Sequence, residues 1–240
     1  MLIAKTNSKR ILRNMSKNKK TNNSKSKVIV PIAVIALLFL AIGVGMGYFK
    51  KNLYTVMKVP DFELTDQNNK KISNKDMLGK VYLVEFFFSK CPTICPVMNT
   101  NMRAIEDEIN NPNFGIISIS IDPENDTPQT LKEHAERIGV KSPNWHFLTG
   151  NRDYIGKLAD QFNIYVGDKE DESESLNHSG MIALVDKEGN VRCRYNKENM
   201  PILYYSGLNY QDPEGKVPKL NGKYHPDREI LTEDIKKLLK

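Results

Sequence analysis

Apolar residues fill one uninterrupted stretch near the start of the chain and then recur in short, separated runs. Residues 28–49 read VIVPIAVIALLFLAIGVGMGYF and contain no charged side chain. A helix of this length is long enough to cross the roughly 30 Å hydrocarbon layer of a bilayer. A buried core helix rarely runs this long without a polar residue, so the pattern predicts a transmembrane helix. The glycines at its end would also permit late cleavage of a signal sequence.

After residue 52 the apolar runs alternate between the patterns of strands and helices. Residues 81–88 (VYLVEFFF) and 115–121 (GIISISI) are continuous apolar runs, typical of central strands covered on both faces. Between them, apolar side chains spaced four, three and four positions apart share one helical face. They are Met98, Met102, Ile105 and Ile109.

The order of the predicted elements defines the fold class. Two short strands are expected within 59–80, before the first central strand. After the second central strand come a helix at 130–140, a short strand near 144–150 and a helix at 152–164. The chain then continues with a hairpin at 181–195 and a closing helix at 229–240. This order predicts an α/β fold with parallel βαβ units followed by an antiparallel pair. Residues 52–240 are enough for one well-packed domain.

The basic composition belongs to a short leader and not to the domain. The chain has 35 basic and 29 acidic residues, and residues 1–27 hold nine of the Lys and Arg residues and no acid, which leaves 26 basic against 29 acidic. A basic composition is the main sequence sign of nucleic-acid binding, and residues 52–240 do not have it. Nucleic-acid binding by the domain is therefore not expected.

The distribution of positive charge also predicts the orientation in a membrane. Positive charge before the apolar stretch places residues 1–27 in the cytoplasm and residues 52–240 outside it. A leader rich in Lys and Asn favours a bacterial plasma membrane. The alternative is a mitochondrial inner membrane, because an acid-free basic leader also suits an organellar transit peptide.

Two cysteines, each followed by proline, come directly after the first central strand in the motif CPTICP. Cys91 and Cys95 are thus expected at the carboxyl edge of the sheet, beside the start of a helix, where sites form. Unpaired N–H groups at a helix start favour the thiolate, which attacks disulfides and binds soft metals. Three residues separate the two cysteines, one more than in a C-x-x-C pair. This wider spacing suits two ligands on one ion. Disulfide chemistry remains the alternative.

Four histidines are the candidates for a further ligand. The surrounding sequence favours a solvated or packed role for His134, a structural role for His146 and an exposed loop position for His225. His178 differs because it ends an acidic loop immediately before an apolar strand, from where it could reach the sheet edge. Spacing alone still favours a loop-end residue bonded to backbone over a ligand.

Acidic residues follow the second central strand in the motif DPENDTP. Asp122 would either tune the cysteine site electrostatically or close a turn, and the sequence does not decide between the two. Asp126 or Thr127, followed by Pro128, has the pattern of a helix N-cap with proline at the first helical position. Cys193, in the predicted hairpin, is expected to be a buried or edge thiol and not a third ligand.

Four motifs now stand together in one order: CPTICP, DPENDTP, WHFLTG and NHS. Over residues 59–195 the chain resembles the SCO/SenC family, copper-binding proteins that assist assembly of cytochrome c oxidase. The resemblance implies a thioredoxin-like fold, a central mixed sheet flanked by helices, behind a single N-terminal transmembrane helix. It also implies that Cys91, Cys95 and His178 bind copper, as Cu(I) or Cu(II), with Asp122 near the site. Residues 196–227 form a longer excursion than the family pattern suggests.

Two functions follow from the residues and the resemblance. The first is a copper metallochaperone that delivers copper to the copper-bearing subunit of cytochrome c oxidase. The second is a thiol–disulfide oxidoreductase that keeps the cysteines of that subunit reduced, with Cys91 attacking and Cys95 resolving. The spacing of the cysteines favours copper binding, and the oxidoreductase would give His178 no clear task.

Overall fold

The structure is a computed structural model, and it describes residues 53–92, 94–164, 180–195, 200–208 and 227–240, together with Ile35 and Leu38. The chain divides into two units, 1–52 and 53–240, and the fold below is that of the second. Among the described residues, no helix has the length and apolar character that a membrane crossing needs. The predicted span at 28–49 lies outside them except for Ile35 and Leu38, so it stays a prediction.

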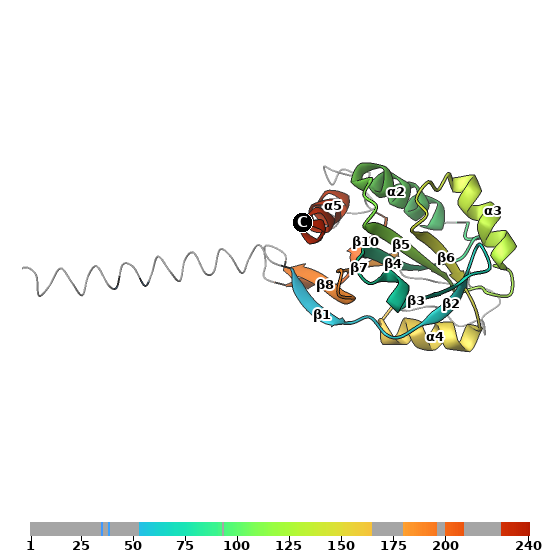
Figure 1. Ribbon diagram of the computed structural model, residues 1–240, viewed down its shortest axis with the longest axis horizontal. Helices are drawn as coiled ribbons and strands as arrows, with labels where there is room; N and C mark the ends of the chain where they lie inside the picture. The colour runs from blue at the N-terminus through green and yellow to red at the C-terminus, as the bar shows by residue number, and fades with distance from the viewer. Residues whose placement is uncertain are drawn as a thin grey trace, which may run out of the picture. The chain divides into compact units, whose positions relative to one another are not determined.

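A mixed sheet of ten strands forms the centre of the described domain (Figure 1). Its strands are β1 (Tyr54–Lys58), β2 (Glu63–Asp66), β3 (Lys71–Ser73), β4 (Val81–Phe87), β5 (Phe114–Ser120), β6 (Trp145–Thr149), β7 (Met181–Val185), β8 (Asn190–Tyr195), β9 (Pro201–Ile202) and β10 (Tyr205–Ser206). The order is β1-β8-β7-β4-β5-β6-β2-β3, with β9 beside β8 and β10 beside β7. Only β4, β5 and β6 pair in parallel among these strands. The α/β class and the mixed sheet predicted from the sequence are thus confirmed.

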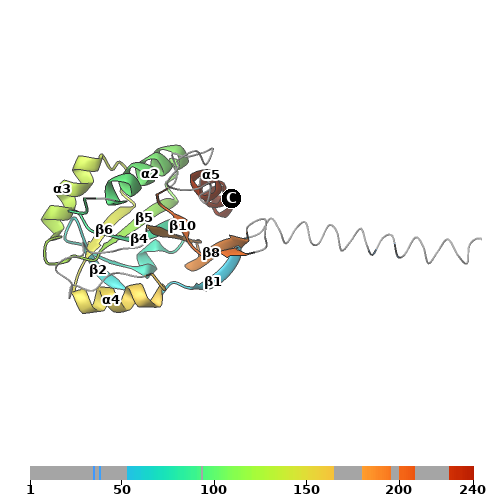
Figure 2. The same cartoon turned by 180° about the vertical axis from the view of Figure 1, so that it is seen from behind.

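Helices cover both faces of this sheet (Figures 1 and 2). They are α2 (Ile94–Ile109), α3 (Pro128–Ile138), α4 (Arg152–Gln161), α5 (Asp227–Leu239) and the short 3-10 helix η1 (Asn74–Met77). Figures 1 and 2 show α2, α3 and α5 on one face and α4 on the other. Every residue of β4 and β5 is buried, as their continuous apolar sequences predicted.

Two parts of the sheet were not predicted from the sequence. β1 has mostly exposed or half-buried residues and no alternation, and it pairs with β8 at the sheet edge. β9 and β10 lie within the excursion predicted at 196–227, and they pair with β8 and β7. The rest of that excursion, apart from residues 200–208 and Asp227, lies outside the described residues.

Candidate metal centre

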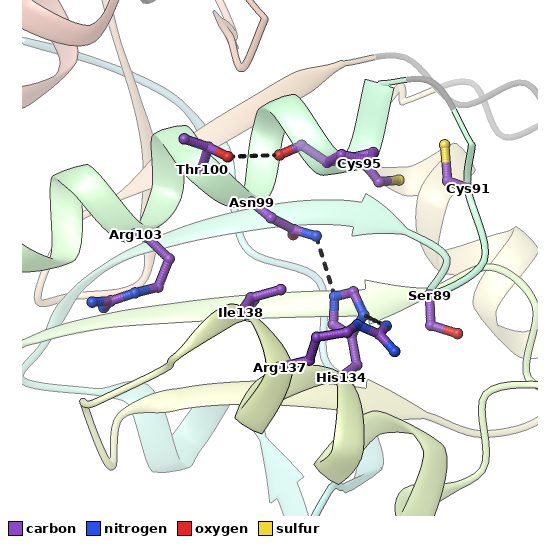
Figure 3. A pocket seen from close by; sticks show the side chains of 10 residues that line it. Ser89, Cys91, Cys95, Asn99, Thr100, Arg103, His134, Arg137 and Ile138 are labelled. Atoms are coloured by element: carbon purple, nitrogen blue, oxygen red, sulfur yellow. Dashed lines mark hydrogen bonds between the residues drawn. The ribbon is translucent and has the colours of Figure 1, made fainter.

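The two cysteines of the CPTICP motif lie where β4 gives way to α2. Cys91 lies in the loop after β4, and its N–H donates to the Phe88 carbonyl oxygen at 3.3 Å. Cys95 lies in the first turn of α2. Both side chains are buried, with 8% and 2% of their surface exposed, and both line one cavity (Figure 3). No disulfide joins the three cysteines of the chain, all of which the structure describes. The expected position at the carboxyl edge of the parallel strands is therefore found.

A buried carboxylate ties the cysteine loop to the sheet. Asp126 is 1% exposed and accepts hydrogen bonds from the Ser89 N–H at 3.0 Å, from the Ser89 hydroxyl, and from the Ser120 hydroxyl at 2.6 Å. The N-cap of α3 is Thr127, whose side chain accepts from the Thr130 N–H at 3.2 Å. Of the two capping candidates, Thr127 is thus correct, and Asp126 instead positions the loop that carries Cys91.

Asp122 makes the contacts of a turn-closing residue. It is 5% exposed, its Oδ2 accepts from the Asn125 side-chain amide at 2.8 Å, and its carbonyl oxygen accepts from the N–H groups of Asn125 and Asp126. Asp122 is not among the described residues that line the cavity beside the cysteines. An electrostatic effect of Asp122 on a bound metal stays a prediction.

Burial decides the protonation of Cys95. Removal from water raises the pKa of its thiol, a hydrogen bond from the Phe88 backbone opposes that change, and the neighbouring Cys91 thiol raises the pKa further. The expectation that the helix start would favour the thiolate is therefore wrong for Cys95 in the metal-free protein. Desolvation of a buried thiolate outweighs the hydrogen bond from the Phe88 backbone, which favours the charged form.

A second buried carboxyl, Glu85, lies on β4. Its side chain is fully buried, and burial raises its pKa to about 7, although a hydrogen bond from Ser118 opposes this. Trp145 Nε1 donates to the Ser118 hydroxyl at 3.0 Å, and that hydroxyl donates to Glu85 Oε1 at 2.7 Å. Oε1 of Glu85 is thus joined to the neighbouring strand β5 through Ser118. Oε2 is buried and has no hydrogen-bond partner among the described residues.

The cavity beside the cysteines has a volume of about 320 Å³. It is lined by Ser89, Cys91, Cys95, Pro96, Asn99, Thr100, Arg103, His134, Arg137 and Ile138. His134 is 3% exposed and packs against the rings of Phe87 and Phe147, at centroid distances of 5.5 and 5.6 Å. Of the solvated and packed roles that the sequence left open for His134, the structure shows the packed one, and its place beside the cysteines was not predicted. One sequence signal pointed to this place: α2 follows β4 and α3 follows β5, so both helices begin at the carboxyl edge of the same sheet.

The remaining candidates do not complete a metal-binding cluster in the described part of the chain. His146 Nδ1 lies 3.3 Å from Asp66 Oδ2, a structural contact as predicted. Cys193 is a buried residue of β8, and its backbone lies opposite Tyr54 of β1 in the antiparallel sheet. Within the described ranges, no group of three His, Cys, Asp or Glu residues could hold a metal ion. His178 and His225 lie outside those ranges, so the predicted third ligand stays a prediction.

Fold and site together define a thioredoxin-like domain with a thiol pair at the carboxyl edge of its parallel strands. The family model SCO1/SenC matches residues 52–209, so the chain belongs to the SCO1/SenC family. A relative, the SCO2-like protein of Rickettsia felis, is 32% identical over 197 residues, which are 73% of this chain and 93% of the relative.

Solved structures with the same fold include two of the Sco family. BsSco, a member of the Sco family of cytochrome c oxidase assembly proteins with a disulfide switch, is 27% identical with a TM-score of 0.59. The match covers 79% of this chain and 96% of BsSco. Bradyrhizobium japonicum ScoI with copper bound is 25% identical with a TM-score of 0.51, and the match covers 77% of this chain and all of ScoI.

Proposed function

We propose that this protein is a membrane-anchored copper metallochaperone that assists assembly of the copper site of cytochrome c oxidase. Cys91, Cys95 and His178 bind the copper, and the copper-bearing subunit of the oxidase receives it. The observation that carries the proposal is the pair of cysteines of one C-x-x-x-C motif lining a single cavity at the sheet edge.

The chemistry of the two sulfurs suits transferable copper. Thiolate sulfur selects soft ions such as Cu(I), and a set of two thiolates and one imidazole leaves room for the sulfurs of a partner. The thiol of Cys95 holds its proton in the metal-free protein because it is buried. Copper binding therefore displaces that proton, and affinity rises with pH.

The family comparison supports the same metal and the same client. ScoI of Bradyrhizobium japonicum has copper bound, and BsSco belongs to a family of cytochrome c oxidase assembly proteins.

The apolar stretch 28–49 anchors the chain, with residues 1–27 in the cytoplasm and residues 52–240 outside a bacterial plasma membrane. A mitochondrial inner membrane is the alternative location.

A thiol–disulfide oxidoreductase is the second candidate function. Cys91 and Cys95 are close enough for a hydrogen bond between their side chains, which a pair that cycles through a disulfide also needs. The likeness to BsSco, with its disulfide switch, favours it as well. Its client would be the oxidised cysteines of the same oxidase subunit.

Copper titration of the reduced full-length chain in detergent tests the proposal. We expect one copper per chain with sulfur-to-copper charge-transfer absorption, loss of both in Cys91→Ser/Cys95→Ser, and weaker binding with altered absorption in His178→Ala. Cys193→Ser is the matched control and should bind like the parent, because Cys193 lies on β8. If the double variant retains the copper of the parent, the cysteines are not ligands. Their reduction potential would then test the oxidoreductase.

A further inference from the structure

The cavity extends beyond the two sulfurs to a wall that copper binding does not use. Asn99 of α2 and His134 and Arg137 of α3 form this wall (Figure 3). His134 Nδ1 lies 2.8 Å from an Arg137 guanidinium nitrogen, and His134 Nε2 lies 3.2 Å from Asn99 Nδ2. The wall is thus a connected polar row from the buried helix face to the cavity rim.

Arg137 carries the positive charge of this wall. Burial lowers the pKa of His134 to about 4, so its ring is neutral near pH 7. Arg103 also lines the cavity, but its guanidinium pairs with Glu106 and with Asp107 at 3.0 Å. Arg137 is exposed, and within the described residues no carboxylate forms an ion pair with it. Its remaining N–H groups are available to an anionic ligand.

Asn99 supplies an unsatisfied polar group beside that charge. The residue is 6% exposed, and while Nδ2 faces His134, Oδ1 is buried and has no hydrogen-bond partner in the described part of the chain. If the amide turns over to meet the ring proton of His134, its NH2 group takes that position instead. In either orientation, one polar atom of Asn99 stays unsatisfied, which costs free energy until a ligand fills the place.

A carboxylate next to a peptide amide complements both features. The carboxylate pairs with Arg137, and the amide, which has both a donor and an acceptor, satisfies either orientation of Asn99. The volume of about 320 Å³ equals roughly ten water molecules at about 30 Å³ each, room for an amino-acid-sized group and not for a folded element.

We propose that Asn99 and Arg137 form a docking subsite for an acidic peptide segment of the partner protein, whose cysteine is thereby brought to Cys91 and Cys95. This inference rests on the proposed function, because it names the chemistry of the partner that exchanges copper there. The acidic residue of the partner binds at Arg137, and its adjoining main-chain amide binds at Asn99.

Two small probes that differ only in charge test the subsite. N-acetylaspartate N-methylamide and its neutral isostere, N-acetylasparagine N-methylamide, are added to the reduced, copper-free full-length chain. The readout is the rate at which iodoacetamide alkylates Cys91 and Cys95, with Cys193 as internal reference. We expect half-maximal protection at a concentration about threefold to fivefold lower for the aspartate probe, which is the upper part of the range for an exposed ion pair.

Variants of two cations on α3 separate the subsite from general electrostatics. Arg137→Ala should abolish the difference between the probes. Lys132→Ala should keep it, because Lys132 is exposed and is not among the described residues that line the cavity. Equal protection by both probes in the parent, or equal effects of the two variants, would overturn the proposal.

Copper titration of the same samples distinguishes failure of the subsite from failure of the function. Arg137→Ala should bind one copper per chain like the parent, because Arg137 is not a ligand. Copper binding without discrimination between the probes would overturn the subsite alone. Discrimination without copper binding would overturn the metallochaperone and leave a peptide subsite beside a thiol pair.

Discussion

Asp126→Ala is expected to lower the free energy of unfolding by about 4 kcal/mol at pH 7, because three hydrogen bonds to a buried carboxylate are lost. The side chain is 1% exposed and accepts from both polar groups of Ser89 and from the Ser120 hydroxyl. Hydrogen bonds to a charged group contribute about 1.5–3 kcal/mol each, and alanine removes the acceptor of the buried Ser120 hydroxyl and of two donors of the half-buried Ser89. Denaturant unfolding of the parent and the variant measures the difference.

The same substitution should weaken copper binding, although Asp126 is not a proposed ligand. Ser89 lies two positions before Cys91, so release of Ser89 loosens the loop that positions the first sulfur. Asp160→Ala is the matched control, because Asp160 lies exposed on α4, and it should change the free energy of unfolding by no more than about 0.5 kcal/mol. If Asp126→Ala lowers the free energy of unfolding as little as the control does, other contacts hold the loop.

The sequence predicted those features that depend on local pattern. The apolar runs identified β4 and β5, and the helical spacing of Met98, Met102 and Ile105 identified the buried face of α2. The position of the cysteines followed because the motif directly succeeds an apolar strand. The order of the elements and the spacing of their apolar residues were enough to predict these elements, because the apolar residues of each one form its buried surface.

Features that depend on contacts between distant segments were missed. The pattern Asp-Thr-Pro is typical of an N-cap, and nothing local shows that Ser89 reaches Asp126 from 37 positions away. Glu85 reads as one polar residue in an apolar strand, and only the pairing of β4 with β5 shows its partner, Ser118. The helical period of α3 likewise does not show that His134 faces the cysteine cavity.

Glu85→Gln should leave stability almost unchanged near pH 4 and raise it by about 3 kcal/mol at pH 8. Burial raises the pKa of Glu85 from 4.5 to about 7 in the folded protein. Between these values the folded state binds a proton that the unfolded state has lost, so stability from this group falls as pH rises through the window. Glutamine imitates the protonated acid and removes the fall, which at about 1.36 kcal/mol per unit amounts to about 3 kcal/mol.

The difference between variant and parent is the quantity to measure, because His134 hides the effect in the parent. Burial lowers the pKa of His134 from 6.5 to about 4, so stability from this group rises with pH over nearly the same window. The two opposing slopes flatten the pH profile of the parent, and Glu85→Gln should expose the rising slope of His134. Denaturant unfolding from pH 4 to pH 8 checks this, with Glu136→Gln on the exposed surface of α3 as the control. If Glu85→Gln shifts stability equally at both ends of the range, Glu85 titrates near its ordinary pKa, and burial does not hold a proton on this carboxyl group at neutral pH.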